Sequence, residues 1–153
     1  MKKIFLHLFL LVVFSLFSLM SYAQCKSFAK KICKLELGVP GYETFYIHDG
    51  NYHAAILTEG EEAELYKTFY SEQEYRIAIC GSEALPDIEF KVIDGNRNVL
   101  YSNKDNNFKR VWDFKLESTQ QLKIAIKVKA RENIPPEEVA HGCVAIMFGF
   151  KDK

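Results

Sequence analysis

From residue 52 onward, apolar and polar residues alternate along the sequence, and this period of two constrains the fold more than any other feature. The clearest case is QLKIAIKVK, residues 121–129, in which Leu, Ile, Ile and Val alternate with Lys and Ala. Successive side chains of a β-strand point to opposite faces, so the pattern predicts a strand with one buried face and one wet face. An amphipathic helix would instead need apolar residues every three or four positions.

Seven further segments read as strands and are separated by turn residues. They are YHAAILTE (52–59), EEAELYKTFY (61–70), QEYRIAIC (73–80), DIEFKVID (87–94), VLYSN (99–103), FKRVWDFKL (108–116) and GCVAIMFGF (142–150). Eight short strands with no helices between them indicate an all-β fold, an antiparallel, jelly-roll-like β-sandwich. The one long break, ARENIPPEEVAH (130–141), has the composition of an exposed loop.

Before the strands, the spacing changes to that of a helix. Cys25, Phe28, Ile32 and Leu35 recur every three or four residues, with lysines between them, before Gly38. This predicts a short N-terminal helix whose apolar side is Phe28, Ile32 and Leu35. The expected organisation is a signal peptide (1–23), the helix packed on the sandwich (24–38) and the β-sandwich domain (39–153).

The parity of two strands predicts where that helix lies. If Ile77 and Ile79 face the core, Cys80 faces outward. In the same way, if Val144 faces the core, Cys143 faces outward. The same outer face carries the small residues Ala78, Ala145 and Gly149. A face of small residues leaves room for the helix.

The first 23 residues read as a cleavable signal peptide. Lys2 and Lys3 precede an apolar run, and Ser21 and Ala23 occupy the −3 and −1 positions of an A-x-A-like cleavage site. The competing interpretation is a membrane anchor, but the run is interrupted by polar residues and falls short of the ~20 apolar residues that a span needs. Lipidation of Cys25 is disfavoured because the preceding Tyr-Ala-Gln is a poor lipobox. We therefore expect an exported protein, periplasmic or extracellular, and membrane attachment only if the leader is retained or Cys25 is lipidated.

Charge argues against nucleic acid as a partner. Without residues 1–23, which hold two lysines and no acidic residue, the chain has 18 basic and 20 acidic side chains, a net charge of −2. Nucleic-acid binding calls for a strongly basic surface.

All four cysteines, Cys25, Cys33, Cys80 and Cys143, follow the predicted cleavage site. An even number of cysteines in an exported chain favours two disulfides. On a regular helix Cys25 and Cys33 lie ~12 Å apart along the axis, so each would have to reach a cysteine of the sheet. If the helix frays, Cys25–Cys33 with Cys80–Cys143 becomes feasible, and we slightly favour this second pairing because the ends of two antiparallel strands meet.

Four blocks carry a resemblance to known proteins. LTEGEEAELYKTFYSEQEYRIAIC, IEFKVIDGNRNVLYSN, VWDFKLESTQQLKIAIKV and GCVAIMFGF, which span most of residues 55–151, resemble a group of small exported proteins of Bacteroidota-type bacteria without an assigned activity. More distantly, the strand order is similar to that of sandwich domains appended to secreted bacterial peptidases. The resemblance implies an exported β-sandwich and supplies no active-site residues.

Two polar clusters could be metal or catalytic sites. Asp94, Asn96 and Asn98 alternate as in a calcium loop, but Val99 stands where such a loop needs glycine, so a plain hairpin turn is favoured and no metal is expected. His48–Asp49 with His53 could form a metal site or a catalytic pair, yet HDGN also reads as a turn. We expect a structural or solvent-facing role.

Catalysis finds no support elsewhere in the sequence. There is no G-x-S-x-G elbow and no glycine-rich phosphate loop, and oxidised cysteines cannot act as thiolates. We therefore predict a protein that is not an enzyme and needs no cofactor.

The predicted function is an exported, non-enzymatic module that binds an envelope or secreted protein. The alternative is a carbohydrate-binding module that presents Tyr66 and Tyr70, which share the outward parity of Glu62 and Glu64. Tyrosines that border the core with wet hydroxyl groups are the plainer interpretation.

Overall fold

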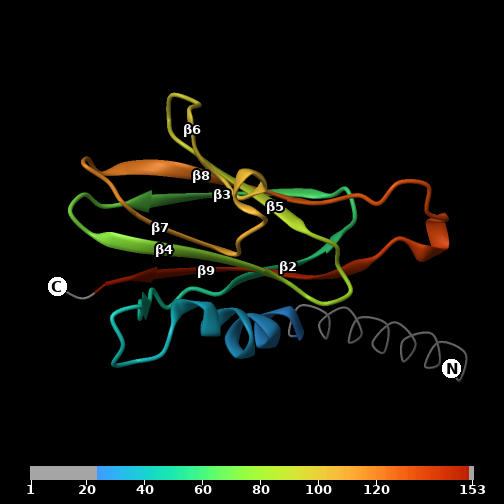
Figure 1. Ribbon diagram of the computed structural model, residues 1–153, viewed down its shortest axis with the longest axis horizontal. Helices are drawn as coiled ribbons and strands as arrows, with labels where there is room; N and C mark the ends of the chain where they lie inside the picture. Colours follow the sequence, from blue (N-terminus) through green and yellow to red (C-terminus); the bar gives the residue numbers. More distant parts are fainter. Residues whose placement is uncertain (1–23, 152–153) are drawn as a thin grey trace, which may run out of the picture.

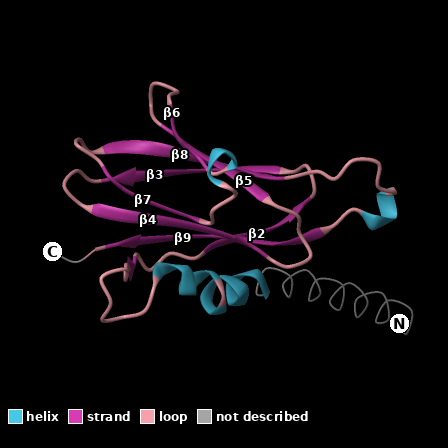
Figure 2. Ribbon diagram, in the orientation of Figure 1, coloured by secondary structure: helices cyan, strands magenta, loops and turns pink. Residues whose placement is uncertain are grey.

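The computed structural model describes residues 24–151, so the predicted signal peptide, residues 1–23, lies outside the described residues. The described chain opens with an α-helix at residues 24–31, which tightens into the 3₁₀-helix η1 (Cys33–Leu37). Everything that follows is built on two stacked antiparallel sheets, and the helix lies across the outside of one of them (Figures 1 and 2).

The two sheets together contain nine strands in the described range. Sheet A consists of β1 (Ile47–His48), β2 (His53–Thr58), β4 (Glu74–Gly81), β7 (Val111–Lys115) and β9 (His141–Phe150). Sheet B consists of β3 (Glu62–Phe69), β5 (Ile88–Ile93), β6 (Val99–Ser102) and β8 (Gln120–Val128). Two short 3₁₀-helices, η2 (Lys104–Asn106) and η3 (Pro136–Glu138), interrupt the loops. The eight predicted strands are all present, and the two-residue β1 is an addition.

The strand pairing is that of a jelly roll. Strand β5 pairs with β6, β4 with β7, β3 with β8 and β2 with β9, so the chain is folded like one long hairpin that has been rolled up. Further pairing of β9 with β4 and of β8 with β5 completes two four-stranded sheets, to which β1 is appended. The predicted antiparallel jelly-roll-like sandwich is confirmed.

The core between the sheets follows the predicted parity. Ile77, Ile79, Val144, Ile146 and Phe148 project inward from sheet A. They meet Phe90 and Val92 of β5 and the alternate residues Leu122 to Val128 of β8, all of which are buried. The lysines of β8 fall on the opposite face, as the alternation requires.

The helix covers the small-residue face of sheet A, as predicted. A second buried cluster packs Ala29, Cys33 and Leu37 against β4 and β9. The residues that these strands contribute are Ala78, Cys80, Ala145 and Met147. At Gly149 a Cβ atom would lie 2.7 Å from the Cβ of Tyr46 and 3.0 Å from Cδ2 of Leu37, so only glycine allows this close approach.

The apolar side expected for the helix is wrong in part. Ile32 and Leu35 are 49% and 73% exposed, while Ala29, Cys33 and Leu37 are buried. The reason is the change of helix type, since a 3₁₀-helix has three residues per turn and rotates each later side chain away from its α-helical position.

The two disulfides tie the helix to the sheet. Cys25 bonds Cys143 with a Cα–Cα distance of 5.2 Å, and Cys33 bonds Cys80 with a Cα–Cα distance of 5.6 Å. The slightly favoured pairing, Cys25–Cys33 with Cys80–Cys143, is therefore wrong, and the regular-helix alternative holds. In the register of β4 with β9, Cys80 lies opposite Ala145 rather than Cys143, so the two sheet cysteines do not face each other. Cys25 is taken up by its disulfide, which leaves no free thiol there for a lipid.

One long side of the sandwich, where β6 and β7 form the edges, is closed by aromatic rings and a buried amide. Tyr101 of sheet B stacks on Trp112 of sheet A with 5.1 Å between ring centroids, and Trp112 stacks on Phe114 at 4.3 Å. Asn103, only 1% exposed, accepts the backbone N–H of Phe90 at 2.8 Å and donates its Nδ2 to the carbonyl of Ile88, also at 2.8 Å. We call this the closed side.

Within residues 24–151, no helix combines the length and the apolar character that crossing a bilayer requires.

Candidate functional site

The opposite long side, where β2 and β3 form the edges, is open. Alanines at inward positions, Ala55 on β2 and Ala63 on β3, leave a hollow of about 240 Å³ between the two strands. Its remaining lining is mostly aliphatic: Leu57, Leu65, Ile126, Val144 and Ile146, with Tyr52, His53, Ala54 and Glu64 at its rim. We call this hollow the side groove.

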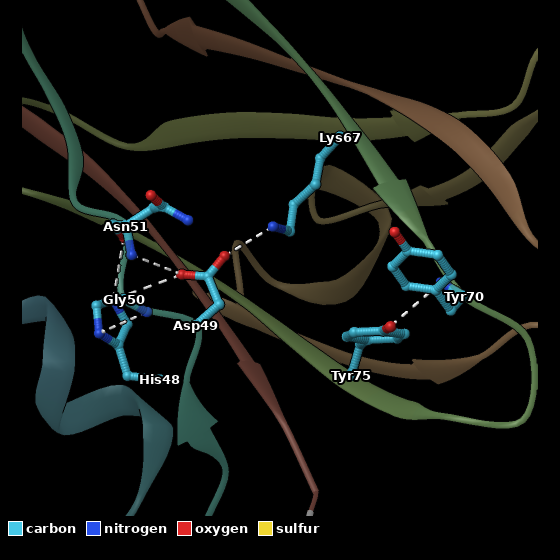
Figure 3. A network of polar contacts seen from close by, with 7 residues as sticks. All are labelled: His48, Asp49, Gly50, Asn51, Lys67, Tyr70 and Tyr75. Atoms are coloured by element: carbon cyan, nitrogen blue, oxygen red, sulfur yellow. Dashed lines mark hydrogen bonds and ion pairs between the residues drawn. The ribbon is translucent and has the colours of Figure 1, made fainter.

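An ion pair closes one end of the side groove. Lys67 occupies an inward position of β3, between Leu65 and Phe69, and its Nζ lies 2.7 Å from Oδ2 of Asp49 in the turn between β1 and β2 (Figure 3). The ammonium group also lies 4.8 Å from the ring centroid of Phe148. Both side chains are largely buried, with 24% of Lys67 and 14% of Asp49 exposed. Because Lys67 belongs to sheet B and Asp49 to the turn between two strands of sheet A, the pair links the edges of the two sheets.

Asp49 and His48 are held by their own turn. The other carboxylate oxygen of Asp49, Oδ1, accepts the backbone N–H of Asn51 at 2.9 Å. The Nε2 atom of His48 lies 3.0 Å from the carbonyl of Asn51, and Nδ1 accepts the backbone N–H of Gly50 at 3.3 Å. With Nδ1 as the acceptor, Nε2 is the ring atom placed to donate to this carbonyl. Figure 3 shows the contacts that the side chains of His48 and Asp49 make with the backbone of this turn.

The pKa shifts follow from this burial. Burial alone raises the pKa of Asp49, but hydrogen bonds from Lys67 and from the backbone of Asn51 outweigh it and lower the pKa below its ordinary value. Burial lowers the pKa of His53, which lines the side groove, and the Asp49 carboxylate only partly opposes that shift. Asp49 is therefore a carboxylate and His53 a neutral ring at pH 7.

Beyond the ion pair, a second hollow of about 310 Å³ lies between the same two edges. Its walls include Lys67, Tyr70, Tyr75 and Phe148. The backbone N–H of Tyr70 donates to the hydroxyl of Tyr75 at 3.1 Å, so that hydroxyl is used within the fold (Figure 3).

The two tyrosines proposed from the sequence are both exposed. Tyr66 is 57% and Tyr70 is 65% exposed. Tyr66 stands on the outer face of sheet B opposite Lys123, and Tyr70 follows the end of β3 and lines the second hollow. Their binding role stays a prediction.

The outer face of sheet B is otherwise a ladder of ion pairs. Lys127 contacts Glu62, directly opposite it in the β3–β8 register, at 2.7 Å, and Lys123 contacts Glu64 diagonally at 2.9 Å. Exposed pairs of this kind contribute little to stability. They do make the face hydrophilic.

In the calcium-like turn, the carboxylate of Asp94 accepts hydrogen bonds from the turn's own residues. One oxygen of Asp94, Oδ1, accepts the backbone N–H groups of Asn96 and Asn98, and the other accepts Nδ2 of Asn98 at 2.9 Å. This is an Asx-type turn at the tip of the β5–β6 hairpin. Across residues 24–151, no group of three or more His, Cys, Asp and Glu side chains is arranged to hold a metal ion.

A larger hollow of about 730 Å³ lies between the helix and the β4–β5 loop, and we regard it as their seam. Two of its polar side chains have partners: Asn103 bonds the backbone, and Arg110 lies 3.8 Å from Glu36. The buried hydroxyl of Ser82 has no hydrogen-bond partner, but it packs against Gly142 on β9, where a Cβ would approach it to 2.2 Å.

The alternation of apolar and polar residues did not single out Lys67 or Asn103. Lys67 had a signal, because it stands at an apolar parity position in β3, where a strand with a wet outer face should hide aliphatic residues. Asn103 had none, since a buried asparagine at the end of a strand reads like any turn residue.

Comparisons with known proteins provide little further guidance. No family model matches the chain, and no curated protein matches it. Among solved structures, the crystal structure of PliG of Aeromonas hydrophila, a periplasmic lysozyme inhibitor of g-type lysozyme, is similar with a TM-score of 0.49 and 10% sequence identity. The similarity covers 72% of this chain and 91% of that chain. It is too distant to carry an argument, and the resemblances to Bacteroidota proteins and to peptidase-appended domains stay predictions.

Proposed function

We propose that this chain is an exported, non-enzymatic module that binds an envelope or secreted protein through the open side of its sandwich. The observation that carries the proposal is the contrast at that side: the charged groups Asp49 and Lys67 are committed to each other, while the side groove beside them is mostly aliphatic and accessible. Lys67 neutralises Asp49, and both nitrogens of His48 serve the turn. A catalytic centre needs groups held free for substrate, whereas a docking site needs apolar surface on a rigid frame.

The frame supports the same proposal. Two disulfides fix the helix to sheet A, and disulfides of this kind persist in oxidising compartments such as the periplasm and the extracellular space. Rigid frames lose little conformational entropy on binding, so apolar contacts translate into affinity more completely.

Site-specific photo-crosslinking in the native host tests the proposal. A benzophenone amino acid replaces Ala55 in the side groove, and a matched variant carries it at Val99, an exposed apolar position on β6 at the closed side. We expect one discrete protein adduct from position 55 and none from position 99. Equal adduct patterns at the two positions, or no adduct at either, would contradict a protein-binding role of the open side.

A carbohydrate-binding module is the second candidate, favoured by the exposure of Tyr66 and Tyr70. Exposed aromatic rings stack on sugar faces, and Tyr70 also lines a hollow that carries the charged groups Asp49 and Lys67. Glycan-array binding that is lost in Tyr66→Ala and Tyr70→Ala, and kept in Tyr42→Ala, would select this candidate. Tyr42 is a suitable control because it is equally exposed, at 70%, in the loop after η1.

A further inference from the structure

Three of the four sheet edges are protected against pairing with another chain. Natural sheets protect their edges with charges, inward-pointing lysines, bulges or short strands. Strand β3 carries Glu62, Glu64 and the inward-pointing Lys67. Strand β6 has four residues, and its pairing with β5 shifts register. Strand β7 carries Asp113 and Lys115, both in ion pairs.

Strand β2 is the exception. Its sequence, HAAILT, has no Asp, Glu, Lys, Arg or Pro, and Ala55 and Ile56 are exposed. The one titratable side chain, His53, is neutral at pH 7 because burial lowers its pKa. Apart from β9, no described strand pairs with β2.

The hydrogen-bonding groups of this edge can be assigned. The N–H of Glu59, directly after β2, donates to the carbonyl of Ala140, on the β9 side. In an antiparallel pair the N–H and C=O of alternate residues point the same way, so the odd-numbered residues face β9. The N–H and C=O groups of Ala54 and Ile56 therefore point outward from the sheet.

Both ends of this outward edge are closed within the fold. At one end the N–H of Thr58 donates to Oε2 of Glu61 at 2.8 Å, and the N–H of Glu61 donates to the carbonyl of Thr58. At the other end stands the turn that holds Asp49. The open stretch thus spans Ala54 to Ile56 with its flanking residues, enough for one short strand.

We propose that β2 accepts an extended segment of the protein partner, which adds to sheet A as a new antiparallel or parallel edge strand and places alternate apolar side chains in the side groove. The proposal rests on the proposed protein-binding function and specifies how the partner is held. Main-chain hydrogen bonds to Ala54 and Ile56 supply the alignment, and the groove between Ala55 and Ala63 selects aliphatic side chains.

The charges at the rim define the rest of the segment. Glu61, Glu62 and Glu64 gather at the turn end of the groove and along β3. Glu62 and Glu64 pair with lysines of β8. Glu61 lies at the turn itself, where only one of its carboxylate oxygens, Oε2, accepts the N–H of Thr58. The partner segment is therefore one with aliphatic residues at alternate positions and a basic residue at one end.

A blocked peptide, acetyl-KVSVSVK-amide, serves as the probe, added to the isotope-labelled exported protein with both disulfides formed. The expected result is a change in the amide signals of Ala54 and Ile56, with slowed hydrogen exchange at both, at peptide concentrations up to about 1 mM. The same peptide with N-methyl groups on its serines and central valine cannot form the ladder and should not bind. This comparison depends only on the wild-type protein, so it holds even if a variant fails to fold.

Protein variants provide the matched pair. Ile56→Pro removes the outward N–H without touching a bond to β9 and should weaken peptide binding at least about tenfold. Ile56→Ala removes the side chain, which points away from the groove, keeps the N–H and should bind within about threefold of wild type.

Any of the following would overturn the proposal: no signal change at about 1 mM peptide, equal binding of the N-methylated peptide, or a concentration-dependent dimer of the protein that Ile56→Pro abolishes. The last would assign the edge to a second copy of this chain. A crosslinked partner at position 55 that persists in Ile56→Pro would keep the binding function and reject strand addition, whereas the absence of any adduct in wild type counts against the binding function itself.

Discussion

The closed side and the open side of the sandwich are built from the same jelly-roll pairing, yet they differ in what fills the space between the two edge strands. At the closed side, Tyr101 of β6 and Trp112 of β7 bring stacked rings across the gap, and Asn103 bonds the backbone beneath them. At the open side, Ala55 of β2 and Ala63 of β3 line a hollow. Beside this hollow, Lys67 of β3 reaches Asp49 in the turn between β1 and β2.

This difference shows how side-chain volume alone can divide one fold into a filled side and a side with an accessible hollow, which we propose as the binding side. Aromatic rings bury large areas and close an edge against water, while alanines leave accessible aliphatic surface. Mutations should therefore cost more stability at the closed side and alter binding more at the open side.

The largest expected effect is the loss of an aromatic ring at the closed side. Trp112→Ala removes the stack between Tyr101 and Phe114 and should lower the free energy of unfolding by about 3 kcal/mol. Its counterpart at the open side is Leu65→Ala. Leu65 is partly buried and borders the side groove, so this substitution should cost about 1 kcal/mol. Urea unfolding followed by far-ultraviolet circular dichroism measures both, and equal losses would show that the two sides do not differ in this way.

The buried amide should come next. Asn103→Ala leaves the N–H of Phe90 and the carbonyl of Ile88 without their partner, so the free energy of unfolding should fall by about 2 kcal/mol. Asn106→Ala in the same loop is the control, since Asn106 is exposed and donates to the carbonyl of Ser102; it should cost less than about 1 kcal/mol. A smaller loss at Asn103 than at Asn106 would contradict the assignment.

At the open side, Lys67→Met tests the ion pair through its pH dependence. Because the folded-state pKa of Asp49 is lowered, the pair stabilises the fold fully above the unfolded pKa of about 3.9 and less as the pH falls below it. We expect the variant to lose about 1 kcal/mol at pH 7, and the difference from wild type to shrink as the pH falls from 4 toward 2. The exposed Lys123→Met control should lose less at pH 7. A difference independent of pH would remove Asp49 from the explanation.

The smallest stability effect is expected from filling the side groove. Ala63→Leu adds aliphatic volume to an open hollow and should change the free energy of unfolding by less than about 1 kcal/mol, while it blocks the KVSVSVK peptide. Val92→Phe adds volume to the fully buried core and should cost more than about 1 kcal/mol. Unchanged peptide binding by Ala63→Leu would show that the groove does not receive side chains.

The strands and their inward faces were predictable because alternation reports the environment of each residue directly, as at Ile77, Ile79 and Cys80. The helix position followed from the small residues Ala78, Ala145 and Gly149. The disulfide pairing was not fixed by the sequence, because it depends on the register that sets Cys80 opposite Ala145 and on the helix staying regular between Cys25 and residue 31. Local patterns report neither register nor the path of a helix.

The candidate site was less predictable than the fold. The outward parity of Tyr66 and Tyr70 could be read from the alternation, and both side chains are exposed, but their binding role stays a prediction. The side groove depends on which two edges meet across the sandwich, and this follows from topology rather than from any local pattern. For the same reason the pairing of Lys67 with Asp49, which lie on different sheets, could not be read from either segment alone.

Residue-resolved hydrogen exchange of the free protein tests the central claim most directly, because it asks whether the edge of β2 is open. The N–H groups of Ala55 and Leu57 face β9, while those of Ala54 and Ile56 face outward. We predict an alternating pattern along β2, in which Ala54 and Ile56 exchange at least about tenfold faster than Ala55 and Leu57. Uniformly slow exchange across all four residues would mean that the edge is already paired, and the open side would then not be the docking side.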